Sequence, residues 1–400
     1  MILAGLTALA LTQDSVDLNA LFRSIDASRM RATIEKLSSW NTRNTSSAEL
    51  TEAVNWVADQ YRKLPGMQVE VMTYTVEPGP RVPAEKQVVE VVAKLPGDDD
   101  EMVLLGGHLD SINMQRQSPT DPLPDPLTAR APGANDDGSG SALTLELARV
   151  MSSHKWRHTL VFCGFSGEEQ GLFGSTALAK RAADEKWKIN AVLSNDMVGN
   201  SSNILGQSDS KHVRLFSDPP DPTGKNPQIS RELARFIEFE VRHKLPSHPV
   251  KLVLRRDRFG RAGDHTPFSE AGFNAVRFTD VFEEYSRQHT PNDLITSVDW
   301  NYLTENAKVN LTALVDLANA GPAPQNLKMD TRQGYNTILR WTATPHTRYI
   351  VYQRDTASST WEKAYDVGEV DHVTLDKVGK DDNFFAVGAV GGVPIPATKN

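Results

Sequence analysis

The spacing of apolar residues predicts alternating helices and strands along the first 320 residues. Residues 24–64 have helical periodicity, clearest in "SAELTEAVNWVADQYRKL". The same spacing predicts helices at 139–153, 170–184, 228–245 and 301–319. Apolar or alternating runs predict strands at "QVEVMTYTV", "QVVEVVAKL", "MVLLGG", "HTLVFCGF", "INAVLSND", "VKLVLR" and "NAVRFTD".

Strands that alternate with helices are typical of βαβ units. The pattern therefore predicts an α/β fold in which helices cover both faces of a mainly parallel, mixed sheet. Strands 68–76 and 87–95 are separated by a turn, so we expect an antiparallel hairpin at one edge of the sheet. Residues 113–135 and 206–227 are rich in proline and are expected to form long loops.

The pattern changes at residue 322, where helical periodicity ends and short β-like runs continue to residue 400. Residues 322–400 are therefore predicted to form a small all-β sandwich, similar to fibronectin type III domains, after a proline-containing linker. We expect its large aromatic residues to form its core rather than a ligand surface; these are Trp341, Tyr349, Tyr352 and Trp361.

Composition narrows the class of protein. The net charge of −8 argues against nucleic acid as the main partner, because phosphate binding needs a concentrated basic face. Cys163 is the single cysteine, so a thiolate metal cluster is excluded, and its apolar surroundings predict burial. The stretch "ILAGLTALALT" is too short to span a membrane, and we interpret residues 1–20 as the remnant of an export signal.

Histidine and acidic residues follow several predicted strands at the point where each strand ends. They are His108 with Asp110, Glu168 with Glu169, Asp196, and His289; the glycine-rich turn "GANDDGSGSA" adds Asp136 and Asp137. In an open α/β sheet ligands bind beyond the carboxyl ends of the strands, so we expect these side chains to meet. Imidazole and carboxylate without thiolate suit zinc or a similar divalent ion. Two Zn²⁺ balance three carboxylates and one hydroxide, which favours two ions.

The blocks "GGHLDS", "GANDDGSGSA", "SGEEQGLFGS", "SNDMVG" and "QHTPND" resemble, in this order, the co-catalytic di-zinc exopeptidases of metallopeptidase family twenty-eight. That family includes secreted bacterial leucyl-type aminopeptidases, and the resemblance covers roughly residues 30–320. It implies a zinc-exopeptidase fold of the phosphorylase/hydrolase-like type for residues 21–320, with two Zn²⁺ per chain.

The resemblance also implies roles for individual residues. Asp136 would bridge both ions, His108 and Asp196 would complete one site, and Glu169 and His289 would complete the other. Glu168 would be the general base, and Asp110 would orient His108.

Two positions depart from the family pattern. The family often has a tyrosine immediately before the last histidine, where this chain has Gln288, with Tyr285 three residues earlier. The family's common Ser-Asp-His block is Gly263-Asp264-His265 here. Asp264 and Tyr285 are therefore candidate substrate-binding residues without an assigned role.

The sequence thus predicts an exported exopeptidase of bacterial type that is made with a signal peptide. We expect it to act on peptides in the periplasm or outside the cell and to have no membrane span. An aminopeptidase that uses a metal-bridged water and a glutamate base fits the resemblance best. A carboxypeptidase or dipeptidase on the same scaffold is the alternative, with Arg258 or Arg261 binding the substrate carboxylate. A glutaminyl-cyclase-like acyltransferase would use a single zinc ion, and a receptor-like module would lack ligands; the complete ligand set argues against both.

Overall fold

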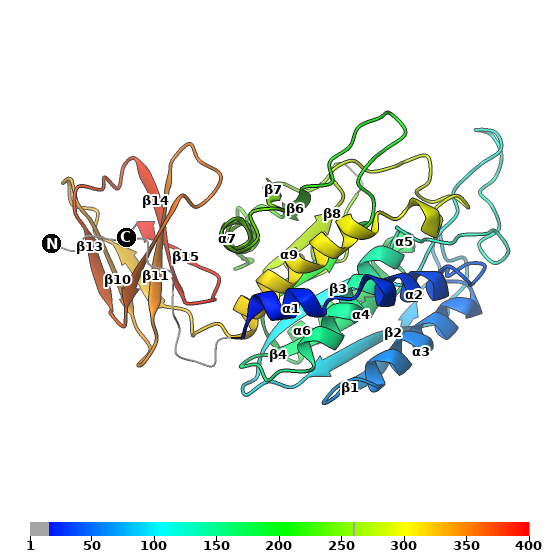
Figure 1. Cartoon of the computed structure of the whole chain (residues 1–400), viewed down its shortest axis with the longest axis horizontal. Helices are drawn as coiled ribbons and strands as arrows, with labels where there is room; N and C mark the ends of the chain where they lie inside the picture. Colours follow the sequence, from blue (N-terminus) through cyan, green and yellow to red (C-terminus); the bar gives the residue numbers. More distant parts are fainter. Residues whose placement is uncertain (1–15, 224, 259–260, 400) are drawn as a thin grey trace.

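The computed structural model describes residues 16–223, 225–258 and 261–399 (Figure 1). Most of the predicted export-signal remnant, residues 1–15, lies outside these ranges, and the first described helix is α1 (Leu18–Ser24). Within the described ranges, no helix combines the length and the apolar character that crossing a membrane requires.

An eight-stranded sheet forms the centre of the larger part of the molecule (Figure 1). In chain order its strands are β1 (Gln68–Val76), β2 (Lys86–Leu95), β3 (Glu101–His108), β4 (Thr159–Phe165), β5 (Lys188–Asn195), β6 (Val213–Ser217), β7 (Val250–Val253) and β8 (Ala275–Thr279). Their spatial order is β1-β2-β4-β3-β5-β8-β6-β7. Strands β4, β3, β5 and β8 run parallel, and β1 and β2 form an antiparallel pair at one edge. Both the mixed sheet and the hairpin confirm the prediction.

Helices cover both faces of this sheet. They are α2 (Ala27–Leu37), α3 (Ala48–Arg62), α4 (Gly138–Met151), α5 (Glu168–Gly171), α6 (Phe173–Asp184), α7 (Ser230–Lys244), α8 (His265–Glu270), α9 (Trp300–Ala318) and the short 3₁₀ helix η1 (Ile295–Ser297). Successive residues of β3 face opposite sides, because side chains alternate along a strand. Val103 and Leu105 pack in one apolar cluster with α2, α3, α4 and α9, whereas Leu104 packs in another with α6 and α8.

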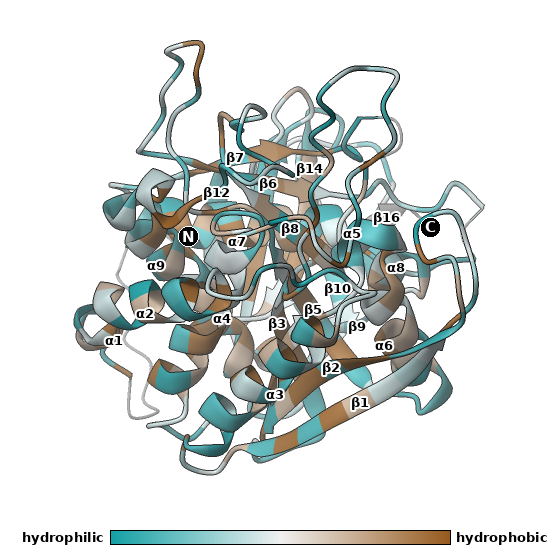
Figure 2. Ribbon diagram, turned by 90° about the vertical axis from the view of Figure 1, so that its right-hand side faces the viewer, coloured by the Kyte–Doolittle hydropathy of each residue, from teal (hydrophilic) through white to brown (hydrophobic). Residues whose placement is uncertain are grey.

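Hydrophobic residues are concentrated along the central strands, and hydrophilic residues occupy the outer turns of α2 and α3 (Figure 2). This distribution is typical of amphipathic helices that pack on a sheet. Cys163 on β4 is buried, as predicted.

Strand β6 and the short helices α1 and α8 were not predicted. Strand β6 lies inside residues 206–227, which were expected to be a loop, and α8 is a helix of six residues. The loop prediction is wrong for Val213–Ser217, because the prolines from Pro219 onward dominated the pattern. Strand β6 is stabilised by pairing on both sides, antiparallel to β8 and parallel to β7.

Residues from 325 onward form two four-stranded sheets (Figure 1). One contains β9 (Gln325–Met329), β10 (Thr337–Thr342), β13 (His372–Leu375) and β16 (Thr398–Lys399); the other contains β11 (Tyr349–Asp355), β12 (Lys363–Gly368), β14 (Asn383–Ala389) and β15 (Ile395–Pro396). Leu339 and Trp341 of the first sheet share an apolar cluster with Tyr349 and Val387 of the second. All four aromatic residues named above are buried, so their predicted place in a core is confirmed.

Candidate metal centre

The carboxyl ends of the parallel strands bring the predicted site residues to one edge of the sheet. His108 is the last residue of β3, and Asp196 directly follows β5. Glu168 begins α5, three residues after the end of β4. Because these strands are parallel neighbours, residues from separate parts of the chain meet at this edge.

Two groups of side chains could each hold a metal ion, and Asp136 belongs to both. In the first group, Nε2 of His108 lies 3.2 Å from Oδ1 of Asp136 and 3.8 Å from Oδ1 of Asp196. In the second group, Nε2 of His289 lies 3.1 Å from Oδ2 of Asp136 and 3.0 Å from Oε2 of Glu169. Asp136 therefore presents one carboxylate oxygen to each histidine.

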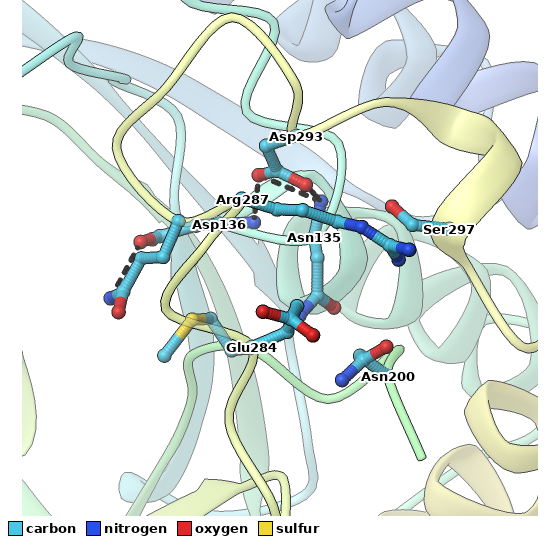
Figure 3. Close-up of a pocket in the computed structure, with 9 residues that line it drawn as sticks. Asn135, Asp136, Asn200, Glu284, Arg287, Asp293 and Ser297 are labelled. Carbon is cyan, nitrogen blue, oxygen red and sulfur yellow. Dashed lines mark hydrogen bonds between the residues drawn. The ribbon is translucent and has the colours of Figure 1, made fainter. Parts of the chain in front are cut away.

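The backbone around Asp136 is held by two other aspartates. Asp293 accepts hydrogen bonds from the amides of Asn135, at 3.0 Å, and Asp136, at 2.9 Å (Figure 3). Asp137 caps α4 by accepting from the Gly140 amide at 2.9 Å, and its other oxygen accepts from the His108 amide at the same distance. The turn that carries Asp136 is thus tied directly to the end of β3.

These residues fit a divalent metal centre. Asp136, Glu169 and Asp196 are all at most 6% exposed, and Oε1 of Glu169 has no hydrogen-bond partner within the described ranges. Burial raises the pKa of Glu169, and crowded buried carboxylates cost free energy unless a cation offsets them. Nitrogen and oxygen donors without a thiolate suit a divalent transition ion.

Asp110 holds the start of α5 in place. Its two carboxylate oxygens accept hydrogen bonds from the amides of Glu168, at 3.1 Å, and Glu169, at 3.0 Å. Its Oδ1 also lies 3.5 Å from Nδ1 of His108, whereas its backbone oxygen lies closer to that nitrogen, at 3.1 Å. Asp110 therefore contacts His108, as predicted, and it also fixes the two adjacent glutamates, which the sequence did not reveal.

A cavity of about 730 Å³ opens beside the two groups. Glu168, Gln288, Tyr285 and Arg261 line it, together with Arg81 and Arg258 among others. Glu168 belongs to neither metal-binding group, and burial raises its pKa well above the usual value for a glutamate. Gln288 donates to Oδ2 of Asp136 at 3.0 Å, so the residue in the family's tyrosine position contacts the shared aspartate.

The three candidate substrate-binding residues occupy different surroundings. Tyr285 is 58% exposed at the cavity rim, where the guanidinium of Arg258 lies 5.5 Å from its ring centroid. Arg261 lines the cavity but forms ion pairs with Glu283 and with Asp257. Asp264 is 2% exposed and is not among the residues that line the cavity, so its contact with substrate stays a prediction.

Sequence reasoning missed two residues that contact the site. Asp293 holds the Asp136 turn, and Arg277 lies 2.9 Å from Oδ2 of Asp196. The available signal for Arg277 was a charged residue inside the apolar strand "NAVRFTD". For Asp293 the signal was a second acidic residue shortly after His289.

Comparison with known proteins agrees with this geometry. Residues 90–314 match the sequence profile described as Peptidase family M28. A "Probable zinc metalloprotease" of Pyrenophora teres f. teres is 35% identical over 415 residues, covering 94% of this chain and 84% of that protein.

Solved structures share the fold at lower identity. The LapA aminopeptidase of Legionella pneumophila aligns with a TM-score of 0.59 and 19% identity, over 78% of this chain and 77% of that one. The glutaminyl cyclase of Fimbriiglobus ruber aligns with a TM-score of 0.55 and 18% identity, over 72% of this chain and 94% of that one.

Proposed function

The chain belongs to peptidase family M28, and on this premise we propose that it is a di-zinc aminopeptidase that releases N-terminal residues from peptides. The main support for two ions is the position of Asp136, because one of its carboxylate oxygens faces His108 and the other faces His289. Curated relatives are described as probable zinc metalloproteases, which supports zinc as the ion.

His108, Asp136 and Asp196 would hold one ion, and Asp136, Glu169 and His289 the other. A pair of bound zinc ions supplies Lewis acidity, which polarises a carbonyl and lowers the pKa of water. The protein's own side chains would bind the substrate and transfer the proton.

Glu168 is suited to moving the proton. Its carboxylate is outside both metal-binding groups, lines the cavity, and stays free for acid–base work. Asp110 anchors the Glu168 amide, so the side chain starts from a fixed backbone position. Because burial raises the pKa of Glu168, this group accepts a proton readily and can deliver it to the departing amine.

The pairing of Arg261 argues against this residue as the carboxylate-binding group of a carboxypeptidase. A carboxypeptidase needs a cation for the free carboxylate of its substrate, and Arg261 lines the cavity. Its guanidinium is already paired with Glu283 and Asp257, so its charge is compensated.

A dipeptidase is the second candidate, and Arg258 is the observation that favours it. Arg258 is exposed, lines the cavity and lies over the Tyr285 ring, where it could meet the carboxylate of a short peptide.

A substrate panel separates these two functions. The aminopeptidase hydrolyses aminoacyl-anilides and C-terminally amidated peptides, and it rejects N-acetylated peptides. Hydrolysis restricted to peptides with a free carboxylate would support the dipeptidase instead, and trimming of N-acetylated peptides from the C-terminus would overturn the aminopeptidase.

We also propose that the protein is exported, to the periplasm or beyond the cell, on the strength of the apolar stretch near its N-terminus. Fractionation of cells that express the chain with and without residues 1–20 tests this proposal. Equal retention of both forms inside the cell would contradict it.

A further inference from the structure

Arg277 on β8 is a buried arginine that contacts a metal-ligand candidate. Its side chain is 1% exposed, and its neighbours Val276 and Phe278 are fully buried. Nη2 lies 2.9 Å from Oδ2 of Asp196, and Nη1 donates to Oδ2 of Asp257 at 3.4 Å. A buried charge is costly unless it is paired, so the guanidinium requires these carboxylates.

The chain makes room for this arginine at Gly263. A β-carbon at position 263 would lie 2.9 Å from Cδ of Arg277, closer than such contacts allow. Any larger side chain at position 263 would therefore require Arg277 to shift.

The position of Arg277 is also fixed from its far side. Asp257, which accepts from Arg277, forms a second ion pair with Arg261, at 3.6 Å, and Arg261 pairs with Glu283. Opposite charges thus alternate from Asp196 to Glu283. The guanidinium cannot move away from Asp196 without disrupting this row.

The contact makes the two metal-binding groups unequal. Oδ2 of Asp196 forms an ion pair with Arg277, whereas Oδ1 lies on the His108 side. In the other group Oε2 of Glu169 faces His289, and Oε1 makes no hydrogen bond to any described residue. One oxygen of Asp196 therefore already faces a protein cation, whereas Oε1 of Glu169 faces none in the described ranges.

We propose that Arg277 is a positioning residue that restricts Asp196 to one donor oxygen and so makes the His108–Asp136–Asp196 position the weaker of the two ion sites. This inference rests on the proposed two-ion function. The positive charge beside Asp196 acts in the same direction, because it opposes a second cation nearby.

The experiment measures zinc affinity at each position separately, by competition with a chelating dye. His289→Ala leaves the first position intact, and His108→Ala leaves the second. Into each background we place the pair Arg277→Met with Asp257→Asn, which removes the contact without changing the net charge. We expect the first-site Kd to fall by about tenfold or more, the scale of effects from residues behind metal ligands. The second-site Kd should change less than about twofold, well below that scale.

Two control variants keep the test informative. Arg214→Met removes another arginine of the same charged region, paired with Glu283 and not with a metal ligand, and should leave both Kd values unchanged. Arg277→Lys keeps the charge and should retain the weak first site. A first-site Kd that stays constant or rises in the Arg277→Met, Asp257→Asn pair would overturn the inference. An otherwise unaltered chain that binds fewer than two zinc ions would instead overturn the proposed function.

Discussion

Glu168 and Glu169 are adjacent in the sequence, yet their carboxylates lie in different surroundings. Oε2 of Glu169 is 3.0 Å from His289, within a metal-binding group. Glu168 lines the cavity and belongs to neither group. Successive residues of a helix point in different directions, and Asp110 fixes the backbone of both glutamates, so the proposed roles of ion binding and proton transfer go to different side chains.

This difference leads to opposite expectations for the two amide variants. Glu168→Gln should keep both ions and lower kcat by roughly 10²–10⁴-fold, the usual contribution of a positioned acid–base group. Glu169→Gln should weaken zinc binding at the His289 position, because an amide is a poorer ligand than a carboxylate. The measurements are kcat and zinc content of both variants. Near-normal kcat in Glu168→Gln, or a loss of activity that follows zinc loss alone, would show that the roles are reversed.

At this scale the sequence predicted which residues meet, because His108, Glu168 and Asp196 follow the ends of parallel strands, which lie at one edge. It did not predict Arg277 or Asp293 as neighbours of the site. A charged residue in an apolar strand indicates a buried pair, but the sequence does not identify its partner. Asp264 was assigned to the pocket from its block alone, and the structure shows that position to be buried.

Among the secondary-structure elements, the short ones escaped prediction. The long helices α3 and α9 span several turns, so their apolar periodicity is clear. Helix α8 has six residues and β6 has five, which is too short for a period to be recognised. Tertiary packing determines both: Phe268 of α8 is fully buried against the sheet, and β6 is paired on both sides.

Helix α8 begins at His265, and this residue makes part of the stability depend on pH. Burial, together with the nearby charge of Arg277, lowers the pKa of His265 to about 3. The folded protein therefore keeps this ring neutral, while the unfolded chain takes up a proton below the ordinary pKa of about 6.5. Stability from His265 is present above pH 6.5 and is lost as the pH falls towards 3.

Lowering the pH from 7.5 to 5.5 should reduce the free energy of unfolding by about 1.4 kcal/mol. This is the energy of one pKa unit, because pH 5.5 lies about one unit below the ordinary pKa of histidine. His265→Gln should lack that part of the pH dependence. The measurement is denaturant unfolding of metal-free protein at both pH values, so that zinc release does not contribute. Identical pH dependence in the two proteins would mean that His265 is protonated in the folded state.

On the scale of the whole molecule, the C-terminal sheet that contains β11 and β14 packs against α7 (Figure 1). The rings of Phe239 and Tyr352 meet edge to face at 5.5 Å, and Arg242 donates to the backbone oxygen of Trp361 at 2.6 Å. Tyr352 and Trp361 also join the main apolar cluster. The sequence predicted an aromatic core for this region but not its packing on α7, because contacts across a linker leave no periodic signal.

This packing affects what truncation should do. The residues that line the cavity beside the metal centre all precede residue 291, so a chain ending near Gly321 should retain kcat and zinc content per folded molecule. Truncation exposes Phe239 and should lower the Tm of the shortened protein by several degrees, since burying such a ring stabilises the folded state by about 1.5–3 kcal/mol. Activity and thermal unfolding of the truncated chain check both parts. A truncated protein that is folded and zinc-loaded yet inactive would contradict this expectation.

The central claim is that one carboxylate, Asp136, serves two ions at once. Zinc content per chain, measured by elemental analysis at saturating zinc for three variants, tests it most directly. We predict two ions for the unaltered chain, one for His108→Ala, one for His289→Ala, and loss of both for Asp136→Asn, with each variant still folded by circular dichroism. An Asp136→Asn protein that still holds two ions, or an unaltered chain that holds only one, would contradict the account.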